Sequence, residues 1–346
     1  MKRSVAILLC LGLLCITPAS LAEPEILVPD AYTQTGTLPV YKATARNFGE
    51  TLQPELFNGS GIASRGDWTL TYNDEATLEW APEALFYREY SGTFNANAGT
   101  EYPAAITARP ALSSAIASLA SWAMFGWPYG GTVFTLEKTT LTHLTLSQAQ
   151  TVFETLLSQL GLKGYTCDYA LDMSLERIHT LGDSMNAMIQ SGAFSTNIPP
   201  CDYQLATAED EGFYLSYHLY GHADGAGDQF SAYALVTARG VVDASIRDAY
   251  IPGEVYEMPE ALVSPETVLA ALPKEIAASR YPEKLVRVLR VELTYAAMRA
   301  SKKADGMVLS PIWSVTYQDE MAGEEGYTSW ADFDAVDGKL LNAIFK

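Results

Sequence analysis

The sequence predicts an α+β protein of two or three modules, each a small antiparallel sheet with one or two helices packed on one face. Two segments in the middle of the chain carry apolar residues three and four positions apart, which is the spacing of a helix with one buried side. Runs that alternate with a period of two follow them, separated by turns rich in glycine and aspartate. The 346 residues suffice for two or three domains of ordinary size.

Residues 1–22 have the features of a secretory signal peptide. Two basic residues precede an apolar run over 5–16, and Ser20 and Ala22 place small side chains before a cleavage site. The apolar run is too short to span a bilayer, which takes about 20 residues in a helix. We therefore expect cleavage near Ala22 and a secreted or extracytoplasmic protein whose mature chain has no transmembrane segment.

The chain is strongly acidic, with 22 basic and 41 acidic residues. Removal of the leader takes away two basic residues, which leaves 20 against 41 and a net charge near −21. Such a surface repels nucleic acid and anionic lipid and attracts basic partners, so we expect no nucleic-acid partner. A hydrophobic content of 48% excludes a disordered acidic tail.

For residues 23–131 the sequence predicts a mixed α+β region. Its small-residue stretch near the end carries apolar side chains at helical spacing, and short alternating runs stand before it. The elements that we expect are a helix over 43–57, strands over 68–72, 76–80 and 84–90, and a helix over 111–125.

Four aromatic side chains stand close together at the end of this region, namely Trp122, Phe125, Trp127 and Tyr129. Such a group is typical of a surface that docks a partner protein, a sugar or a membrane, so the four are candidate binding residues. The alternative, and the commoner outcome for clustered aromatics, is that they form the core of the preceding sheet.

The middle module is expected over 132–256. Ser147 and Gln150 have the spacing of a capping box, and Gly161 ends the helix that they begin. A second helix is predicted over 174–191. The strands that follow are predicted over 213–220, 230–237 and 241–247.

Only Cys167 and Cys201 remain after the leader, in a chain that we expect to be exported to an oxidising compartment. We predict a disulfide between them. The bond would close a loop of about 35 residues and would contribute roughly 3–4 kcal/mol in the chain-entropy model. The chain has no Cys-x-x-Cys spacing, which argues against a redox or metal role for these cysteines.

His218, His222 and Asp224 form the one cluster with metal-ligand residue types. Two histidines four apart bind zinc well when both lie on one face of a helix. Here the run over 213–220 alternates like a strand, which places His218 in a strand and His222 in the next loop. An exposed polar hairpin is the simpler interpretation, so we expect no metal and no cofactor.

Two patterns bear on catalysis. Gly182-Asp183-Ser184 resembles the nucleophile block of one esterase class, but it falls inside a predicted helix rather than on the turn that a nucleophile needs. Clustered acids, such as those at 209–211 and at 332 and 334, would suit a glycosidase only if two of them face one cleft. We identify no catalytic residues. A secreted hydrolase that uses a carboxylate pair on glycan or peptide is the alternative to a non-enzymatic role.

The last module is expected over 257–346. Ser264-Pro265-Glu266 is a helix start, with a hydroxyl cap, proline at the first position and an acid at the positive end of the dipole. A strand over 285–295 follows, with Leu289 on one side and Val288 on the other. Further strands are predicted over 308–317, 329–335 and 339–341, with a turn at Asp337-Gly338.

This ending resembles a PepSY-type module, of the kind found in the YycH/YycI-like extracytoplasmic regulators of Gram-positive bacteria. The resemblance is carried by the Pro-x-Trp-x-Val strand at 311–315 and by the Asp-Ala-x-x-Gly hairpin at 334–338. It implies a non-catalytic, exported binding or regulatory protein that acts through protein–protein contacts with an envelope or membrane-protein partner. The helix starts at 146–149 and 263–266 are also similar, and both a tandem repeat and coincidence would explain that.

Overall fold

A computed structural model describes residues 25–27, 38–48, 61–65, 68–72, 76–91, 109–125, 136–192, 201–219, 229–277, 285–300, 306–319 and 328–344. The fold is α+β and is dominated by antiparallel sheet. The chain divides into two compact units. The larger unit takes residues 38–258 and 294–310, and the smaller unit takes 1–37, 259–293 and 311–346. The predicted signal peptide, 1–22, lies outside the described residues.

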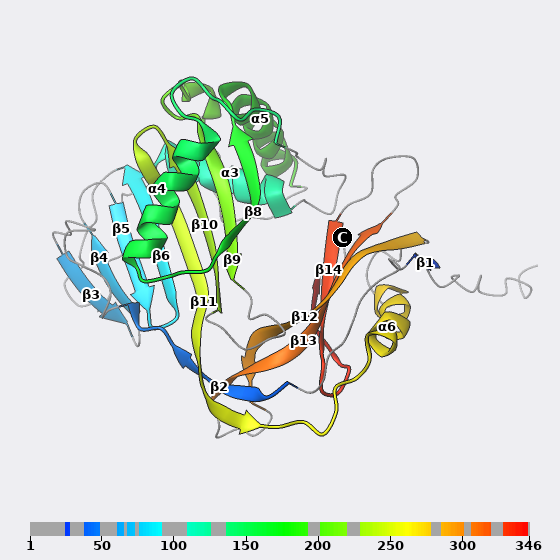
Figure 1. The fold of residues 1–346 in the computed structure, drawn as a ribbon. Helices are drawn as coiled ribbons and strands as arrows, with labels where there is room; N and C mark the ends of the chain where they lie inside the picture. Colours follow the sequence, from blue (N-terminus) through cyan, green and yellow to red (C-terminus); the bar gives the residue numbers. More distant parts are fainter. Residues whose placement is uncertain are drawn as a thin grey trace, which may run out of the picture. The chain divides into compact units, whose positions relative to one another are not determined.

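The larger unit is organised around an antiparallel sheet in the strand order β8-β9-β10-β11-β6-β5-β4-β3 (Figure 1). Its central strand, β11, pairs with β10 and β6 through its first half and with β2 through its second half. The strands are β2 (Val40–Ala45), β3 (Gly61–Arg65), β4 (Trp68–Tyr72), β5 (Ala76–Ala81), β6 (Ala84–Ser91), β7 (Arg109–Pro110), β8 (Thr166–Met173), β9 (Gly212–Leu219), β10 (Gln229–Thr237) and β11 (Gly240–Glu257).

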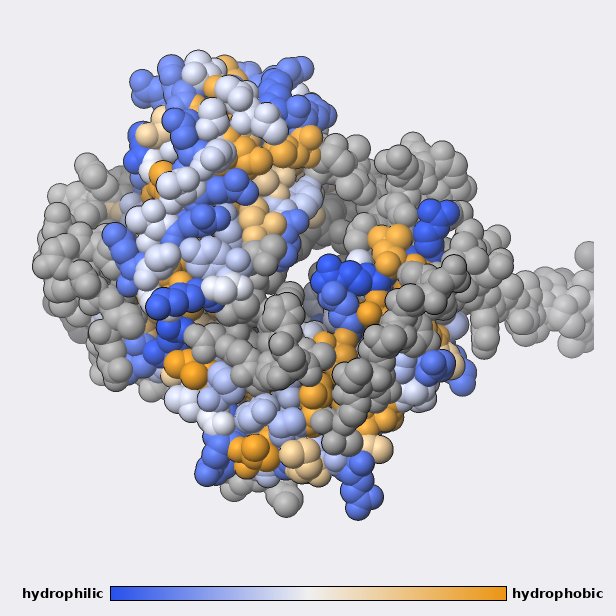
Figure 2. All heavy atoms as spheres, in the orientation of Figure 1, coloured by the Kyte–Doolittle hydropathy of each residue, from blue (hydrophilic) through white to orange (hydrophobic). Residues whose placement is uncertain are grey.

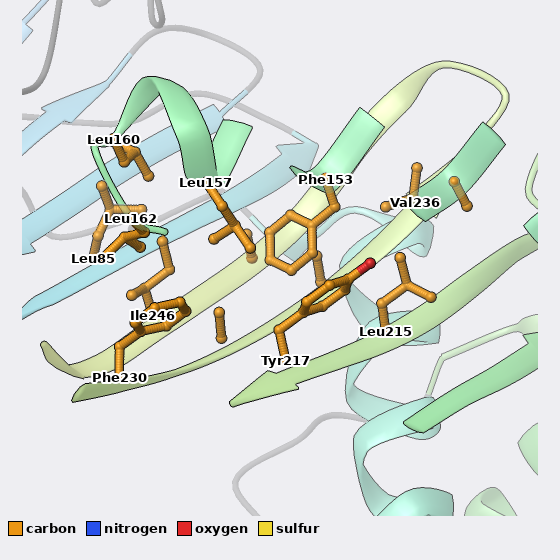
Figure 3. Close-up of a cluster of buried hydrophobic side chains, with 14 of the residues drawn as sticks. Leu85, Phe153, Leu157, Leu160, Leu162, Leu215, Tyr217, Phe230, Val236 and Ile246 are labelled. Carbon is orange, nitrogen blue, oxygen red and sulfur yellow. The ribbon is translucent and has the colours of Figure 1, made fainter. Parts of the chain in front are cut away.

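One face of this sheet is covered by α4 (Leu146–Gln159). Phe153 and Leu157 of the helix are fully buried and pack on Tyr217 and Ile246 of the strands (Figure 3). The helix begins at Thr145, whose side chain accepts from the backbone of Gln148 while the Gln148 side chain accepts from the backbone of Thr145. The capping box therefore lies two residues before the predicted one, because Thr145 and not Ser147 has the extended backbone that a cap requires.

The opposite face is covered by α3 (Leu112–Phe125), α5 (Leu175–Ser191) and the short 3₁₀ helix η2 (Tyr203–Leu205). Small residues of α3 pack closely on Leu171, Leu235 and Val242 of the strands. In Figure 1, α4 lies in front of these strands and α3 behind them. The larger unit thus has helices on both faces of its sheet, whereas the sequence predicted helices on one.

The smaller unit contains α6 (Pro265–Ala277) and the strands β1 (Glu25–Leu27), β14 (Thr328–Asp334) and β15 (Leu340–Ile344). It also contains the part of β12 (Leu285–Arg299) before residue 294 and the part of β13 (Met307–Asp319) from residue 311 onward. β1 is parallel to β12, and β13, β14 and β15 form an antiparallel meander. The indole N–H of Trp313 donates to the carbonyl of Val263 at 2.9 Å, and the Val263 N–H donates to the carbonyl of Ala335 at 2.8 Å. These bonds fasten the segment before α6 to the meander.

Many predicted elements are confirmed within the described residues, including the helices over 111–125 and 174–191 and the strands over 68–72 and 76–80. The helix predicted over 43–57 is wrong for its first residues, which belong to β2 because they pair with β11. The rest of that range, beyond Phe48, lies outside the described residues.

The strand predicted over 285–295 is confirmed as part of β12, with Val288 and Leu289 on opposite sides of it. Val288 is 2% exposed and Leu289 is 42% exposed, so the buried side at this end of the strand is the one that carries Val286 and Val288. The boundary predicted near 256 lies close to the change of unit after Met258, whereas the regions predicted as 23–131 and 132–256 both contribute to the larger unit.

Candidate binding surface

Of the four aromatics that the sequence singled out, Trp122 is the one whose side chain the structure describes. It is half-buried on α3 and packs against the cluster between α3, α5 and the sheet. Its indole N–H is buried and has no hydrogen-bond partner among the described residues. Phe125 ends α3, but its side chain, like Trp127 and Tyr129, lies outside the described part. Trp122 thus serves the core more than the surface.

Cys167 and Cys201 are free thiols, so the predicted disulfide is not formed in the structure. The reason is their placement. Cys167 packs with the cluster beneath α4, and its thiol lies 3.6 Å from the carbonyl oxygen of Tyr169. Cys201 packs with the cluster beneath α3 and α5, on the other face of the sheet. The sheet itself separates the two side chains.

The metal candidates do not assemble within the described residues. His218 lies in β9, opposite Thr166 of β8 and Ser231 of β10. Its side chain, together with His222 and Asp224, lies outside the described part of the chain. Among the residues that the structure does describe, no group of three histidine, cysteine or acidic side chains is placed to hold a metal ion.

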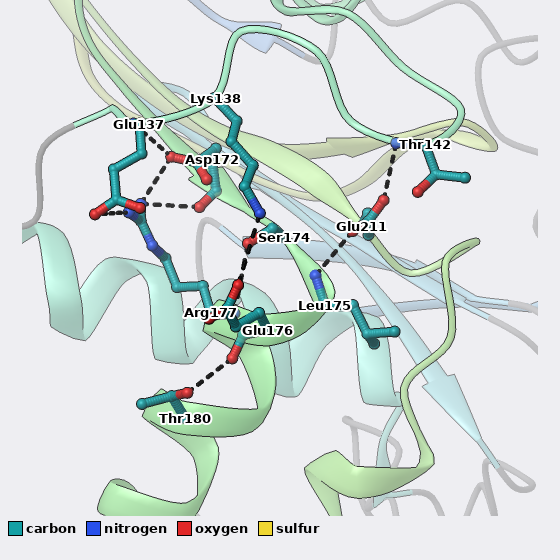
Figure 4. A network of polar contacts seen from close by, with 10 residues as sticks. All are labelled: Glu137, Lys138, Thr142, Asp172, Ser174, Leu175, Glu176, Arg177, Thr180 and Glu211. Carbon is teal, nitrogen blue, oxygen red and sulfur yellow. Dashed lines mark hydrogen bonds and ion pairs between the residues drawn. The ribbon is translucent and has the colours of Figure 1, made fainter.

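Several acids of the larger unit hold secondary structure together (Figure 4). The buried carboxylate of Asp172 accepts from Arg177 at 2.8 Å and from the backbone of Glu137 at 3.0 Å. Glu211 accepts from the backbone N–H groups of Thr142 and Leu175, both at 2.9 Å. Burial acts to raise the pKa of Glu211, but a hydrogen bond from the Thr142 side chain, the two backbone hydrogen bonds and the charge of Lys138 outweigh it and leave the pKa below its ordinary value. These contacts fasten the start of α5 to the segment before α4.

The other acids proposed for a hydrolase also have structural surroundings. Burial raises the pKa of both Asp332 and Asp334 on β14, and Asp334 accepts from the backbone of Val336 in the closing turn. Burial is the largest cause of both shifts, and the hydrogen bonds that Asp332 accepts from Ser314 and Asp334 from Val336 oppose it. Ser184 lies within α5, where its hydroxyl donates to the carbonyl of Thr180 at 2.9 Å. This placement matches the expectation of a helical serine.

A different surface emerges on the sheet face that carries α3 and α5. Five residues from five neighbouring strands lie directly opposite one another there, in the order Tyr169, Ser216, Tyr233, Ser245 and Phe86. We call them the Tyr/Ser row. Tyr169 and Tyr233 border the helical cluster, and all members except Ser216 are half-buried. The row therefore runs across the sheet at the border of the helical cover.

Arg247 adds a guanidinium group to this surface, where Asp168 and Asp248 also lie close enough to Tyr233 to influence its pKa. The guanidinium of Arg247 lies 5.1 Å from the centre of the Phe86 ring, and its Nε donates to the Ser245 hydroxyl at 3.0 Å. Tyr233 lies nearly parallel to the buried ring of Tyr214, at 6.5 Å between ring centres. Burial raises the pKa of the Tyr233 hydroxyl, although Arg247 opposes the shift, so the hydroxyl stays protonated at neutral pH.

The Tyr/Ser row and Arg247 combine the residue types that dominate protein–protein contacts, tyrosine and arginine, on strands that fix their positions. Sequence reasoning missed them because the row depends on pairing between strands far apart in the chain. The one available signal was the alternation in β10 and β11, where Tyr233 and Ser245 stand between apolar residues and Arg247 follows Ile246.

No family model matches this chain, and no curated protein matches it. Among solved structures, the chain is similar to an uncharacterized protein from Eubacterium rectale ATCC 33656, with 14% sequence identity and a TM-score of 0.49. The similarity covers 92% of this chain and 89% of that chain. It carries no argument about function. In the described residues, no helix has the length and apolar character needed to cross a bilayer.

Proposed function

We propose that this protein is an exported, non-enzymatic binding or regulatory protein of the cell envelope, which acts through protein–protein contacts. The observation that carries the proposal is the Tyr/Ser row with Arg247. Half-buried aromatic side chains on a rigid sheet lose little conformational entropy when a partner covers them, and the exposed Arg247 is held by its contacts with Phe86 and Ser245. An envelope protein or the outer part of a membrane protein is the partner that export would make accessible.

Three further observations support this proposal. The leader over 1–22 has the composition of a signal peptide. The acids at 172, 211 and 334 accept structural hydrogen bonds. The motifs that resemble a PepSY-type module, at 311–315 and 334–338, hold the start of α6 through Trp313 and Ala335. We accordingly propose that the smaller unit is a PepSY-like helix-plus-meander module with a binding role.

The test is site-specific photo-crosslinking in the cells that produce the protein. A photoreactive amino acid is placed at Tyr233 or Arg247, and at Met258 as a control, since Met258 is 58% exposed and lies outside the row. We expect one envelope protein to be crosslinked from the two row positions and not from Met258. Circular dichroism and thermal unfolding of each variant establish that the fold is retained.

Two outcomes would overturn the proposal. One is the same pattern of crosslinks from Met258 as from the row, which would indicate random collisions. The other is turnover of a glycoside or peptide substrate that is lost in Asp332→Asn or Asp334→Asn, because it would establish a hydrolase that uses a carboxylate pair.

A further inference from the structure

A second surface feature lies on α4, away from the Tyr/Ser row. It is an open groove of about 460 Å³ beside the outer side of the helix. Figure 2 shows mainly pale and blue, polar residues in the area of α4. The groove is lined by Thr151, Glu154, Thr155, Ser158, Gln159 and Tyr165.

The hydroxyl groups of this groove donate hydrogen bonds to other groups of the protein. Thr151 donates to the carbonyl of Ser147 at 2.8 Å, and Thr155 donates to the carbonyl of Thr151 at 2.7 Å. The Tyr165 hydroxyl donates to the carbonyl of Glu154 at 3.1 Å. Because its proton is used there, the 3.2 Å contact between Tyr165 and Ser158 requires the serine to donate. The oxygens of Thr151, Thr155 and Ser158 therefore keep their acceptor capacity, the Tyr165 oxygen already accepts from Ser158, and none of the four has a second proton to give.

Glu154 adds a carboxylate whose position is fixed. The Tyr217 hydroxyl, which Figure 3 shows at the edge of the buried cluster, donates to Glu154 Oε1 at 2.9 Å. One hydrogen bond leaves most of the acceptor capacity of a carboxylate unused. The Tyr165 ring is also held, since it meets the rings of Tyr217 and Phe230 edge to face, at 5.5 and 6.2 Å between centres.

We propose that this groove binds the ammonium or guanidinium group of a lysine or arginine side chain of a partner protein. Such a group has only donors, and the lining offers acceptors, one carboxylate and one aromatic ring. None of the six lining residues is basic, and Gln159 supplies the one amide donor. A net charge of −19 draws cations toward the chain. A neutral sugar fits less well, because its hydroxyls also need donors from the protein.

The experiment titrates the folded protein, without its leader, with a blocked tripeptide that has a central arginine. Backbone amide shifts in two-dimensional NMR report binding at 151–165. The same peptide with citrulline in place of arginine keeps the shape and removes the charge. A neutral N-acetylglucosamine trisaccharide is the third probe. Glu154→Gln removes the charge of the groove and keeps an acceptor for Tyr217. Glu209→Gln removes one charge at an exposed position elsewhere and is the matched control.

We expect saturable shifts at 151–165 with the arginine peptide, roughly fivefold weaker binding in Glu154→Gln, and unchanged binding in Glu209→Gln. Binding should also weaken as salt is added. The inference is overturned if citrulline binds as well as arginine, if only the trisaccharide shifts these amides, if the two variants behave alike, or if no probe binds. The groove does not include the Tyr/Ser row. The result of this experiment therefore does not decide whether a partner binds the row, which the crosslinking experiment tests separately.

Discussion

At Gly182, helix α5 touches the ring of Tyr203 directly. A Cβ atom at this position would lie 2.4 Å from the ring, which no real contact permits. The glycine of the esterase-like Gly182-Asp183-Ser184 pattern is thus explained by close packing of η2 on the helix. The neighbouring Asp183 accepts hydrogen bonds from Gln204 at 3.1 and 3.2 Å, which fastens η2 on the same side.

Gly182→Ala is expected to lower the free energy of unfolding by about 2 kcal/mol, because overpacking outweighs the gain of about 1 kcal/mol in helix propensity. Urea unfolding followed by circular dichroism measures the change. In a Tyr203→Ala background the obstacle is gone, and the same substitution should become stabilising. A stabilising effect in the natural background would contradict the packing described here.

The ionised form of Asp243 is disfavoured in the folded protein, because the carboxyl group is buried. Burial raises its pKa to about 6, and the guanidinium of Arg88, 3.2 Å away, opposes this shift only in part. The folded protein therefore binds the Asp243 proton more tightly than the unfolded chain, whose carboxyl keeps the ordinary value of 3.8. The contribution of Asp243 to stability must accordingly rise as the pH falls from above 6 toward 4.

Asp243→Asn removes this titration. Relative to the natural protein, the variant should gain stability as the pH rises from 4 to 7, by at most about 3 kcal/mol. Urea unfolding at a series of pH values gives the two curves. Glu209→Gln, which changes an exposed acid, should run parallel to the natural protein. Parallel curves for Asp243→Asn would show that the carboxyl has an ordinary pKa in the folded state.

At the scale of the elements, helix α4 depends on the residue that begins it. The reciprocal bonds between Thr145 and Gln148 satisfy two backbone N–H groups that the helix leaves unpaired. The hydroxyl of Ser147, two residues later, has no such role in the cap.

Thr145→Ala should therefore cost about 1 kcal/mol of unfolding free energy. Ser147→Ala, a matched change in the first turn, should cost nothing or stabilise slightly, since alanine is the better helix former. Thermal unfolding of the two variants compares them directly. A larger loss in Ser147→Ala would restore the capping box predicted from the sequence.

The elements that sequence reasoning found are those with local causes. α5 has its N-cap at Ser174 and a left-handed glycine at its C-terminal end, Gly192, and both residue types can be recognised in the sequence. The strand β8 was missed because a bulge near Asp168 breaks its alternation. Residues 43–45 were assigned to a helix because their partner strand lies more than 200 residues away. The Tyr/Ser row could not be predicted for the same reason, since no local pattern fixes which strands are neighbours.

At the scale of the whole molecule, the sheet of the larger unit separates two clusters of buried hydrophobic side chains. Cys167 lies with the cluster under α4 and Cys201 with the cluster under α3 and α5. Export to an oxidising compartment would still leave these thiols without each other as partners, because a disulfide needs Cα atoms within about 7 Å.

Titration of residues 23–346 with a thiol reagent, unfolded in denaturant without reductant, should find two thiols per chain. Each lies partly buried, so the folded protein should react more slowly than the unfolded one. Finding no thiol would mean that the two cysteines are joined and that the arrangement around them differs from the one described.

The division of the chain has a consequence for how the protein can be taken apart. β12 and β13 each begin or end in one unit and continue into the other, and residues 294–310 return to the larger unit to lie against β2. Tyr295, in the part of β12 that belongs to the larger unit, donates to the carbonyl of Pro39 at 3.0 Å. A single cut after Met258 would therefore leave residues 294–310, which belong to the larger unit, on the second fragment. It would also leave residues 1–37, which belong to the smaller unit, on the first fragment. Residues 259–346 therefore cannot be moved to another protein as a complete unit through a single junction.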